Sequence, residues 1–194
     1  TCFLQKHIRN SQFHLAMRSG VPRKVNSLFK DGKVDGAFIS SILSENENCG
    51  NLGIIARKDV LSVLVLSGEN IEDSESQTSN MLSKILRVDG KVLIGDKALI
   101  HYFQNRNGID LAEKWNEKFG KPFVFAKLCY KKNLKTFKKI ENKFLKTKTF
   151  IPHYIMEKEK KRLGLSRNEI LFYLSKIDYF CDKKKQNGIE KVPC

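Results

Sequence analysis

Short apolar runs separated by segments of helical periodicity make up most of this sequence. Runs of about four to eight apolar residues favour buried strands, and apolar residues that recur every three or four positions favour amphipathic helices. The sequence therefore predicts strands at 12–17, 36–40, 53–56, 60–66, 91–94 and 123–130. We expect the run GAFIS, residues 36–40, to be a fully buried parallel strand in a βαβ unit with 12–17.

Helical segments lie between and after these strands. Pro22 suits the first position of a helix, and the spacing of Ser166 and Glu169 is that of a capping box. Helices are predicted from Pro22 to the Asp31-Gly32 turn, from Thr78 to Gly90, and at 95–103, 111–119, 134–145, 152–163 and 166–181. We expect polar loops at 44–51 and 67–77 and a frayed tail from Asp182. Strands alternating with helices, followed by a helical segment, predict the α/β class.

Composition and charge narrow the function classes. The 194 residues are 41% hydrophobic and 29% charged, which suffices for a real core in one domain or two small lobes. The sequence has no run of about 18 apolar residues, so it predicts no membrane span. The first residues lack the apolar core of a secretory signal. The formal net charge is +15, which attracts polyanions. However, the lysines are scattered at helical spacing, so we interpret them as solvated helix faces and expect no nucleic-acid partner.

The cysteines point to a reducing compartment. Five are present, an odd number, and none forms a CxxC pair. This pattern argues against a disulfide framework and against a zinc site. We therefore expect a cytoplasmic protein in which each cysteine is a small buried apolar side chain.

Small polar residues stand at strand ends and at one helix start. A helix N-terminus offers free N–H groups to a carboxylate or phosphate, and nearby hydroxyls add donors. The ordinary alternative for Thr78, Ser79 and Asp96 is a helix cap. For Ser40, Ser41 and Ser62 it is a local hydrogen bond. The residues alone indicate an α/β protein with a cleft suited to a small anion. The candidate positions are Ser40, Ser41, Ser62, Thr78, Ser79, Gly95 and Asp96.

Several stretches, taken in order, resemble one enzyme family. They are GVPRKVN (20–26), VDGAFISSI (34–42), VLSVLVLS (60–67), TSN (78–80), KVLIGDKAL (91–99) and DLAEKWNEKFGKPFVFA (110–126). Together they resemble the chorismate dehydratases of the futalosine route to menaquinone. The match spans most of residues 20–130, and its most specific part is LIGDKAL followed by DLAEKWNEKFGKPFVFA.

The resemblance implies a fold and a division of the chain. It implies a two-lobed fold like that of type II periplasmic-binding proteins, with two crossover strands and a C-terminal helical segment. Residues 1–66 with 127–194 would form the first lobe, and 67–126 the smaller second lobe. The strands VLSVLVL and FVFAKLCY would be the crossovers, with the site between the lobes.

The resemblance also implies a reaction. The family removes water from chorismate to give 3-enolpyruvoylbenzoate, so the protein would be a hydro-lyase without metal or cofactor. Ser62 would be the polar anchor beside the reacting ring, and Thr78 and Ser79 the clamp for a substrate carboxylate. Ser40, Ser41, Gly95 and Asp96 would line the cleft. The proton acceptor stays open, the enolpyruvyl carboxylate of the substrate being one candidate, and so does the oligomeric state.

Two departures from the family pattern bear on the site. The family opens with a strand and a turn of the type GxIxYxNxLP, and the Asn of that turn belongs to its site. This sequence has no counterpart of the turn, and its segment between TSN and KVLIGD is short. The first alternative function is a solute-binding protein that holds a small carboxylate anion without reaction. A second, which rests on the net charge alone, is a nucleic-acid-binding regulator.

Overall fold

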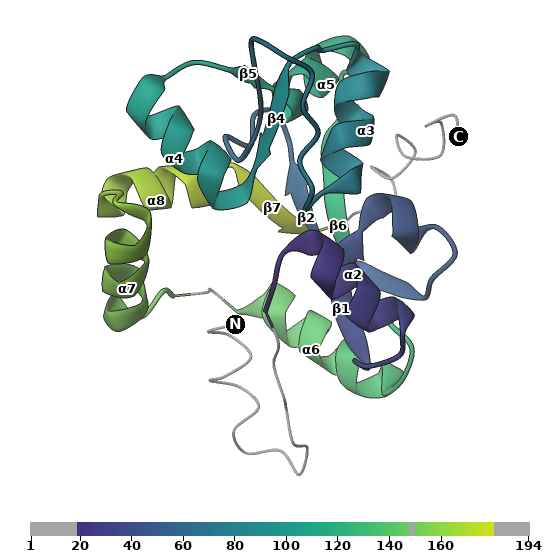
Figure 1. Ribbon diagram of the computed structural model, residues 1–194. Coiled ribbons are helices and arrows are strands. Elements are labelled where there is room, and N and C mark those ends of the chain that lie inside the picture. Colours follow the sequence, from purple (N-terminus) through teal and green to yellow (C-terminus); the bar gives the residue numbers. More distant parts are fainter. Residues whose placement is uncertain (1–18, 148–149, 181–194) are drawn as a thin grey trace.

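Four strands form the larger of two sheets in the computed structural model, which describes residues 19–147 and 150–180 (Figure 1). Every pairing within this sheet is antiparallel. In spatial order the strands are β1 (Gly36–Ser40), β6 (Phe123–Tyr130), β2 (Cys49–Ala56) and β7 (Ile177–Phe180). The predicted strand at 12–17, the end of the last predicted helix and the tail from Asp182 lie outside the described residues.

Three shorter strands form the smaller sheet, and they too pair antiparallel. Residues 57–62 run from β2 of the larger sheet into β3, and α5 leads back into β6 (Figure 1). The chain therefore passes twice between the sheets within the described residues. In spatial order the strands are β4 (Lys91–Ile94), β3 (Val63–Leu66) and β5 (Ile109–Asp110).

Two helices flank opposite faces of the larger sheet. Phe29 of α2 (Pro22–Lys30) packs with Ile39 and Cys129. Phe137 of α6 (Leu134–Lys146) stacks on Tyr130, which neighbours Cys129 along β6. Because successive side chains of a strand point to opposite faces, α2 and α6 lie on opposite sides. A short 3₁₀ helix, η1 (Ser41–Ser44), follows β1 directly.

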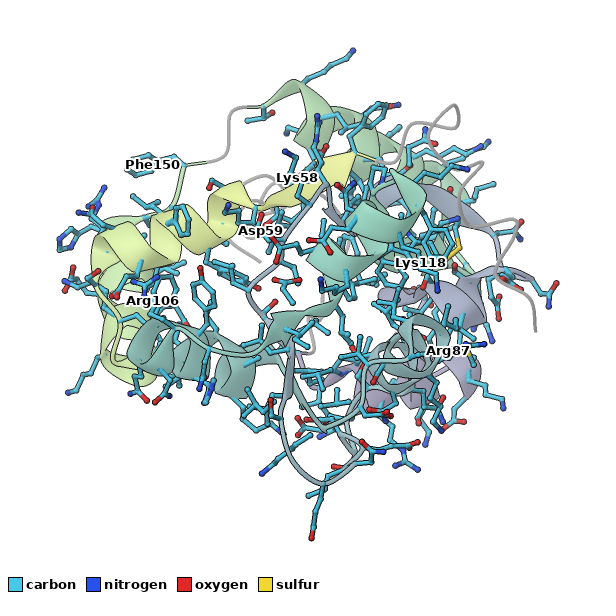
Figure 2. The ribbon with its side chains drawn as sticks, turned by 90° about the horizontal axis from the view of Figure 1, so that it is seen from above. Lys58, Asp59, Arg87, Arg106, Lys118 and Phe150 are labelled. Carbon is cyan, nitrogen blue, oxygen red and sulfur yellow. A yellow bond between two sulfur atoms is a disulfide. The ribbon has the colours of Figure 1, made fainter. Side chains whose placement is uncertain are left out.

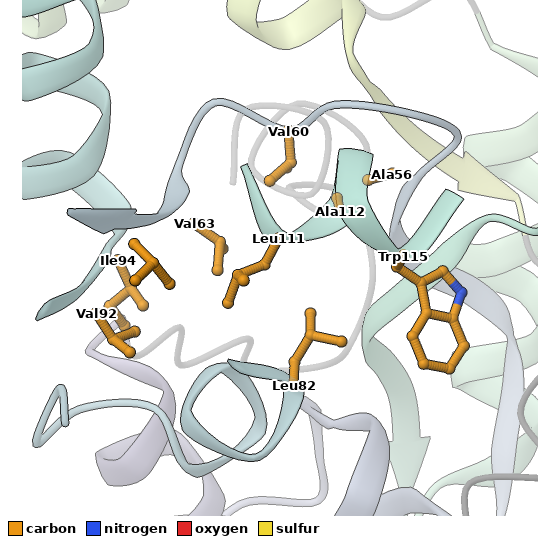
Figure 3. Close-up of a cluster of buried hydrophobic side chains, with 10 residues drawn as sticks. Ala56, Val60, Val63, Leu82, Val92, Ile94, Leu111, Ala112 and Trp115 are labelled. Atoms are coloured by element: carbon orange, nitrogen blue, oxygen red, sulfur yellow. The ribbon is translucent and has the colours of Figure 1, made fainter. Parts of the chain in front are cut away.

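The main apolar core lies between the smaller sheet and two of its helices, α3 (Gln77–Leu86) and α5 (Leu111–Phe119). Figure 3 shows Leu111 between Val63 and Leu82 at the centre of this core. Ala56 and Val60 belong to the same cluster, so the core extends along the chain that joins the sheets. Its members are Ala56, Val60, Val63, Val65, Leu82, Val92, Ile94, Leu111, Ala112 and Trp115.

The C-terminal helices touch both halves of the molecule. Met156 of α7 (His153–Leu163) and Ile170 of α8 (Arg167–Ser175) pack with Leu99 of α4 (Gly95–Asn105) in a second apolar cluster. The chain then forms β7, which pairs with β2 of the larger sheet. The segment from α7 to β7 therefore contacts the helical layer of the smaller sheet and the edge of the larger one.

The structure confirms the α/β class but corrects four local predictions. Residues 60–62, predicted as the start of a strand, precede β3 (Val63–Leu66) and belong to the chain that joins the sheets. Strand β1 is antiparallel and half exposed, not a buried parallel strand, because its partner is β6, which arrives from the other sheet. Residues 49–51 belong to β2 and not to a polar loop. Helix α8 ends at Ser175, and 177–180 form a strand because the edge of β2 offers backbone partners. No described helix has the length and apolar character to cross a membrane.

The structure also corrects the prediction that no disulfide forms. Cys49 and Cys129 face each other on β2 and β6 and are joined as a disulfide. They lie 80 residues apart in sequence, so no short spacing reveals the pair. The argument from the cysteines to a reducing compartment therefore loses its basis for these two residues.

A buried carboxylate fixes an irregularity of β2. The ladder between β2 and β6 shifts register between Cys49 and Gly53. There Glu141 of α6, which is buried, accepts a hydrogen bond from the Leu52 backbone N–H at 3.1 Å. A Cβ atom at Gly50 would collide with this carboxylate. The bulge, the glycine and Glu141 therefore depend on one another.

This arrangement predicts a pH-dependent stability term. Burial raises the pKa of Glu141 above its ordinary value, against the opposing effect of the backbone N–H groups. The folded protein then binds this proton more tightly than the unfolded chain, so wild-type stability rises as pH falls through the folded pKa. Glu141→Gln should remove that rise, measured by urea unfolding at a series of pH values. Glu169→Gln is the control. The Ser166 N–H lowers the pKa of Glu169, so the stability that this carboxylate contributes is lost, not gained, as pH falls. An unchanged pH profile in Glu141→Gln would contradict the assignment.

Candidate functional site

The chain between the two sheets, residues 57–62, is called the crossover from here on. It is held by the C-terminal segment, which runs from α7 to β7. Arg57 Nε lies 2.8 Å from a carboxylate oxygen of Asp178 in β7. Asp59 pairs with Lys176 Nζ at 2.8 Å, and Figure 2 shows Asp59 beside the yellow-green ribbon of α8 and β7. Both ion pairs tie the crossover to the junction of α8 and β7.

Ser62 stands at the end of this crossover and is buried. Its carbonyl oxygen accepts a hydrogen bond from the Gly95 N–H at 2.8 Å. Its side chain is a hydrogen-bond partner of Tyr173 in α8. Burial raises the pKa of Tyr173, and the bond with Ser62 opposes that shift. The serine hydroxyl therefore has an aromatic partner that sequence reasoning missed, because the C-terminal helices lie outside the motifs.

Gly95 and Asp96 form a sharp strand-to-helix corner. Helix α4 begins at Gly95, whose φ of +60° lies in the left-handed region that favours glycine. Asp96 does not cap the helix but forms an ion pair with Arg162 of α7, and both side chains are about half exposed. The pair joins the first turn of α4 to the C-terminal segment.

The start of α3 holds the candidate carboxylate clamp. Ser76 is the helix cap, and its hydroxyl accepts the Ser79 N–H at 3.2 Å and donates to the Ser79 hydroxyl at 2.9 Å. Thr78 is 4% exposed, and its Oγ1 has no hydrogen-bond partner among the described residues. Buried hydroxyls nearly always have one. The Thr78 hydroxyl at this helix start is therefore an exception, as is the buried indole N–H of Trp115.

Ser40 ends β1 and Ser41 begins η1, and both residues are also buried. Asn26 of α2 brackets Ser40, since its Nδ2 donates to the Ser40 hydroxyl at 3.0 Å and its Oδ1 accepts the Ser40 N–H at 3.1 Å. The carbonyl of Ser41 accepts the Ser44 hydroxyl at 2.7 Å. Asn26 lies in the stretch GVPRKVN, but its polarity alone gave no signal.

Residues 73–75 link these groups. The Arg23 N–H of α2 donates to the Glu75 carbonyl at 3.1 Å, which joins the helix beside Ser40 to the loop before α3. Lys97, one residue after Asp96, bridges the carboxylates of Asp73 at 3.1 Å and Glu75 at 3.2 Å. These contacts connect Ser40, the start of α3 and the start of α4 indirectly, whereas Gly95 and Ser62 are hydrogen-bonded to each other directly.

The loop before α3 is itself built around a buried aspartate. The Asp73 N–H donates to Asn80 Oδ1 at 2.9 Å, and Asn80 Nδ2 donates back to the Asp73 carbonyl at 2.8 Å. The predicted exposed loop at 67–77 is therefore exposed in its first half but anchored at Asp73 and Ser76, which are buried. This anchoring sets the position of the α3 N-terminus.

The arrangement offers neutral donors more than charges. Hydroxyls and helix N–H groups suit a carboxylate. In the part of the chain that the structure describes, no group of three or more His, Cys, Asp or Glu side chains is placed to hold a metal ion. The fold and the site thus define an α/β protein with two antiparallel sheets and a hydroxyl-rich polar region where the chain passes between them.

Comparison with known proteins identifies the family. A family model described as menaquinone biosynthesis matches residues 79–192. The chorismate dehydratase of Campylobacter jejuni subsp. jejuni is 43% identical over 170 residues, which cover 86% of this chain and 76% of that protein. The chain therefore belongs to the chorismate dehydratase family of menaquinone biosynthesis.

Loss of the Lys97 bridge should destabilise the protein. The Asp73 side chain is 3% exposed and that of Lys97 is 55% exposed, so Lys97→Met leaves a buried carboxylate without its cation. We expect a loss of about 1 kcal/mol in the free energy of unfolding, below the value for a fully buried pair because Lys97 reaches solvent. The control Lys84→Met removes an ion pair with Glu72 in which both side chains are exposed. Chemical denaturation should show the larger loss for Lys97→Met, and equal losses would contradict the network.

Proposed function

We propose that this chain removes water from chorismate to give 3-enolpyruvoylbenzoate, as a hydro-lyase of menaquinone biosynthesis. The observation that carries the proposal is the 43% identity with a chorismate dehydratase over 86% of the chain. This stretch is long enough to include most of the candidate positions. The buried, unpartnered hydroxyl of Thr78 supports a ligand site at the start of α3.

The proposal includes a two-lobed fold like that of type II periplasmic-binding proteins. Residues 1–66 with 127–194 would form one lobe and 67–126 the other. Two separate sheets joined by residues 57–62 and by the start of β6 support a division into two lobes, although β3 (Val63–Leu66) pairs within the smaller sheet and so goes with the second lobe. Phe123 and Phe125 of β6 pack against the core of the smaller sheet, while the same strand pairs in the larger one, as a crossover strand would.

The reaction needs a held carboxylate more than it needs a strong acid or base. Loss of the ring C4 hydroxyl and the neighbouring ring proton makes the chorismate ring aromatic, which supplies a large driving force. The negative charge left by the proton spreads through the diene to the ring carboxylate. Preorganised donors on that carboxylate would stabilise the developing charge. The α3 N-terminus, with Thr78 and Ser79, would supply them.

The other candidate residues would set the geometry. Ser62 would anchor the substrate beside the reacting ring, with Tyr173 orienting its hydroxyl. Ser40 and Ser41 would face the substrate from β1, and Gly95 and Asp96 from the start of α4. The ion pair with Arg162 ties Asp96 to α7, so Asp96 would line the site through its backbone more than through its carboxylate.

Thr78→Val tests the carboxylate clamp against a purely structural role. Valine keeps the shape of threonine but removes a hydroxyl that is buried without a partner. Stability should stay equal or rise by about 1 kcal/mol, because an unsatisfied polar group is lost. In contrast, kcat/KM for chorismate should fall about tenfold, since one hydrogen bond to a charged group is lost. Steady-state kinetics and urea unfolding measure the two effects.

The matched control is Thr136→Val, a half-buried threonine of α6 outside the proposed site, which should leave kcat/KM unchanged. A Thr78→Val protein that loses stability and keeps its kcat/KM would show that the hydroxyl is structural.

Incubation with chorismate, followed by ultraviolet absorbance and product analysis, tests the function itself. Aromatic product that depends on the protein supports the lyase. Tight, reversible binding of chorismate without product would instead support a solute-binding protein. Ser62→Ala should lower kcat by about tenfold or more while leaving most of the binding, if Ser62 acts on the reacting ring.

A further inference from the structure

Asp110 binds two separate segments of backbone with one buried carboxylate. Its Oδ1 accepts the N–H groups of Ala112 at 2.9 Å and Glu113 at 3.2 Å, which is an ordinary cap of α5. Its Oδ2 accepts the N–H groups of Val60 at 2.8 Å and Leu61 at 2.6 Å. Val60 stands 50 residues earlier in the chain, on the crossover. The second half of this contact exceeds what a helix cap requires.

The crossover at this point has an unusual backbone. Leu61 has a φ of +61°, in the left-handed region that bulky side chains rarely adopt. Its side chain is buried with Leu99 and Met156 in the second apolar cluster. A residue keeps such a conformation only where its surroundings determine it. Here the surroundings are Asp110 on the backbone side and the apolar cluster on the side-chain side.

The residue that follows is Ser62. The orientation of its N–H and of its side chain depends on the backbone conformation of Leu61, the preceding residue. On its other side, the carbonyl of Ser62 is fixed by the Gly95 N–H at 2.8 Å. Asp110 thus holds the two residues before the serine, and the Gly95 N–H holds the carbonyl of the serine itself.

We propose that Asp110 is a positioning residue for catalysis, which holds the crossover backbone at Val60 and Leu61 so that the Ser62 hydroxyl is aimed at the substrate. This inference rests on the proposed function of Ser62. Asp110 itself would touch no reacting atom. Its effect on the reaction would pass through Ser62 alone.

Glu141 provides a matched comparison within the chain. It too is a buried carboxylate that accepts a backbone N–H, that of Leu52. It lies on the α6 face of the larger sheet, opposite to α2, and has no role in the proposed site. Glu141→Gln therefore reports what the loss of a buried carboxylate costs in stability alone.

Two substitutions divide the functions of Asp110. Asp110→Ser keeps a hydroxyl that can cap α5, but its single oxygen does not reach the crossover. Asp110→Asn keeps the size and turns an NH₂ donor toward one pair of N–H groups. We expect kcat to fall by about 10- to 100-fold in both, with KM changed less than about threefold, because a small misplacement of a positioned group costs rate. Glu141→Gln should retain kcat within about twofold.

The decisive measurement is a double-mutant cycle with Ser62→Ala. If Asp110 acts through Ser62, Asp110→Ser should lower kcat strongly in the wild-type background and less than about twofold in the Ser62→Ala background. Equal losses in the two backgrounds would overturn the proposal, because they would assign Asp110 an effect independent of Ser62.

Hydrogen exchange tests the same contact without relying on turnover. The wild-type amides of Val60 and Leu61 should exchange as slowly as those of β3, and in Asp110→Asn they should exchange about tenfold faster or more. Fast exchange at these amides in the wild type would overturn the proposal even if chorismate is dehydrated. Absence of turnover in a wild type with protected amides would reject the proposed function and leave the backbone anchor confirmed.

Discussion

The structure depends on how the irregular chain between the two sheets, residues 57–62, finds hydrogen-bond partners for its backbone N–H and C=O groups. Residues 57–62 leave one ladder and have not yet entered the next, yet Val60, Leu61 and Ser62 are buried. A buried N–H or C=O without a partner is costly. The Asp110 carboxylate takes up two of these N–H groups, and the Gly95 N–H satisfies the Ser62 carbonyl. The corner at Gly95 is therefore part of the crossover's own hydrogen bonding.

The same constraint explains why carboxylates serve as scaffolding and hydroxyls remain for a ligand. Asp73, Asp110 and Glu141 are buried, and each accepts a backbone N–H from another residue of the scaffold. Thr78, in contrast, keeps its hydroxyl free at the start of a helix. A doubly negative substrate would meet these three carboxylates already hydrogen-bonded to backbone N–H groups. It would find neutral donors whose positions the scaffold has fixed.

The sequence predicted the helices and the apolar strands well because their periodicity depends on local burial. Helix α5 and strand β4 agree with the expected segments at 111–119 and 91–94. The failures are long-range. Residues 177–180 have a helical pattern, but the free edge of β2 makes them a strand. Cys49 and Cys129 meet only because β2 and β6 pair. For the proposed site, the motifs indicated Ser62 and Thr78, which stay predictions, but could not indicate Tyr173 or the second set of contacts of Asp110, since these depend on contacts across the fold.

Contacts with the C-terminal segment restrain the crossover, residues 57–62, against bending. In a simple two-lobed protein the crossovers are the natural place for bending. Here Arg57 forms an ion pair with Asp178, and Asp59 forms one with Lys176. Leu61 packs against α7 and α8, and the Ser62 side chain is a hydrogen-bond partner of Tyr173. Bending at any of these residues would break a contact to a segment that also pairs with the larger sheet through β7. A serine held in this way stays in place whether or not substrate is bound, so its geometry would be set by folding and not by the arrival of the ligand.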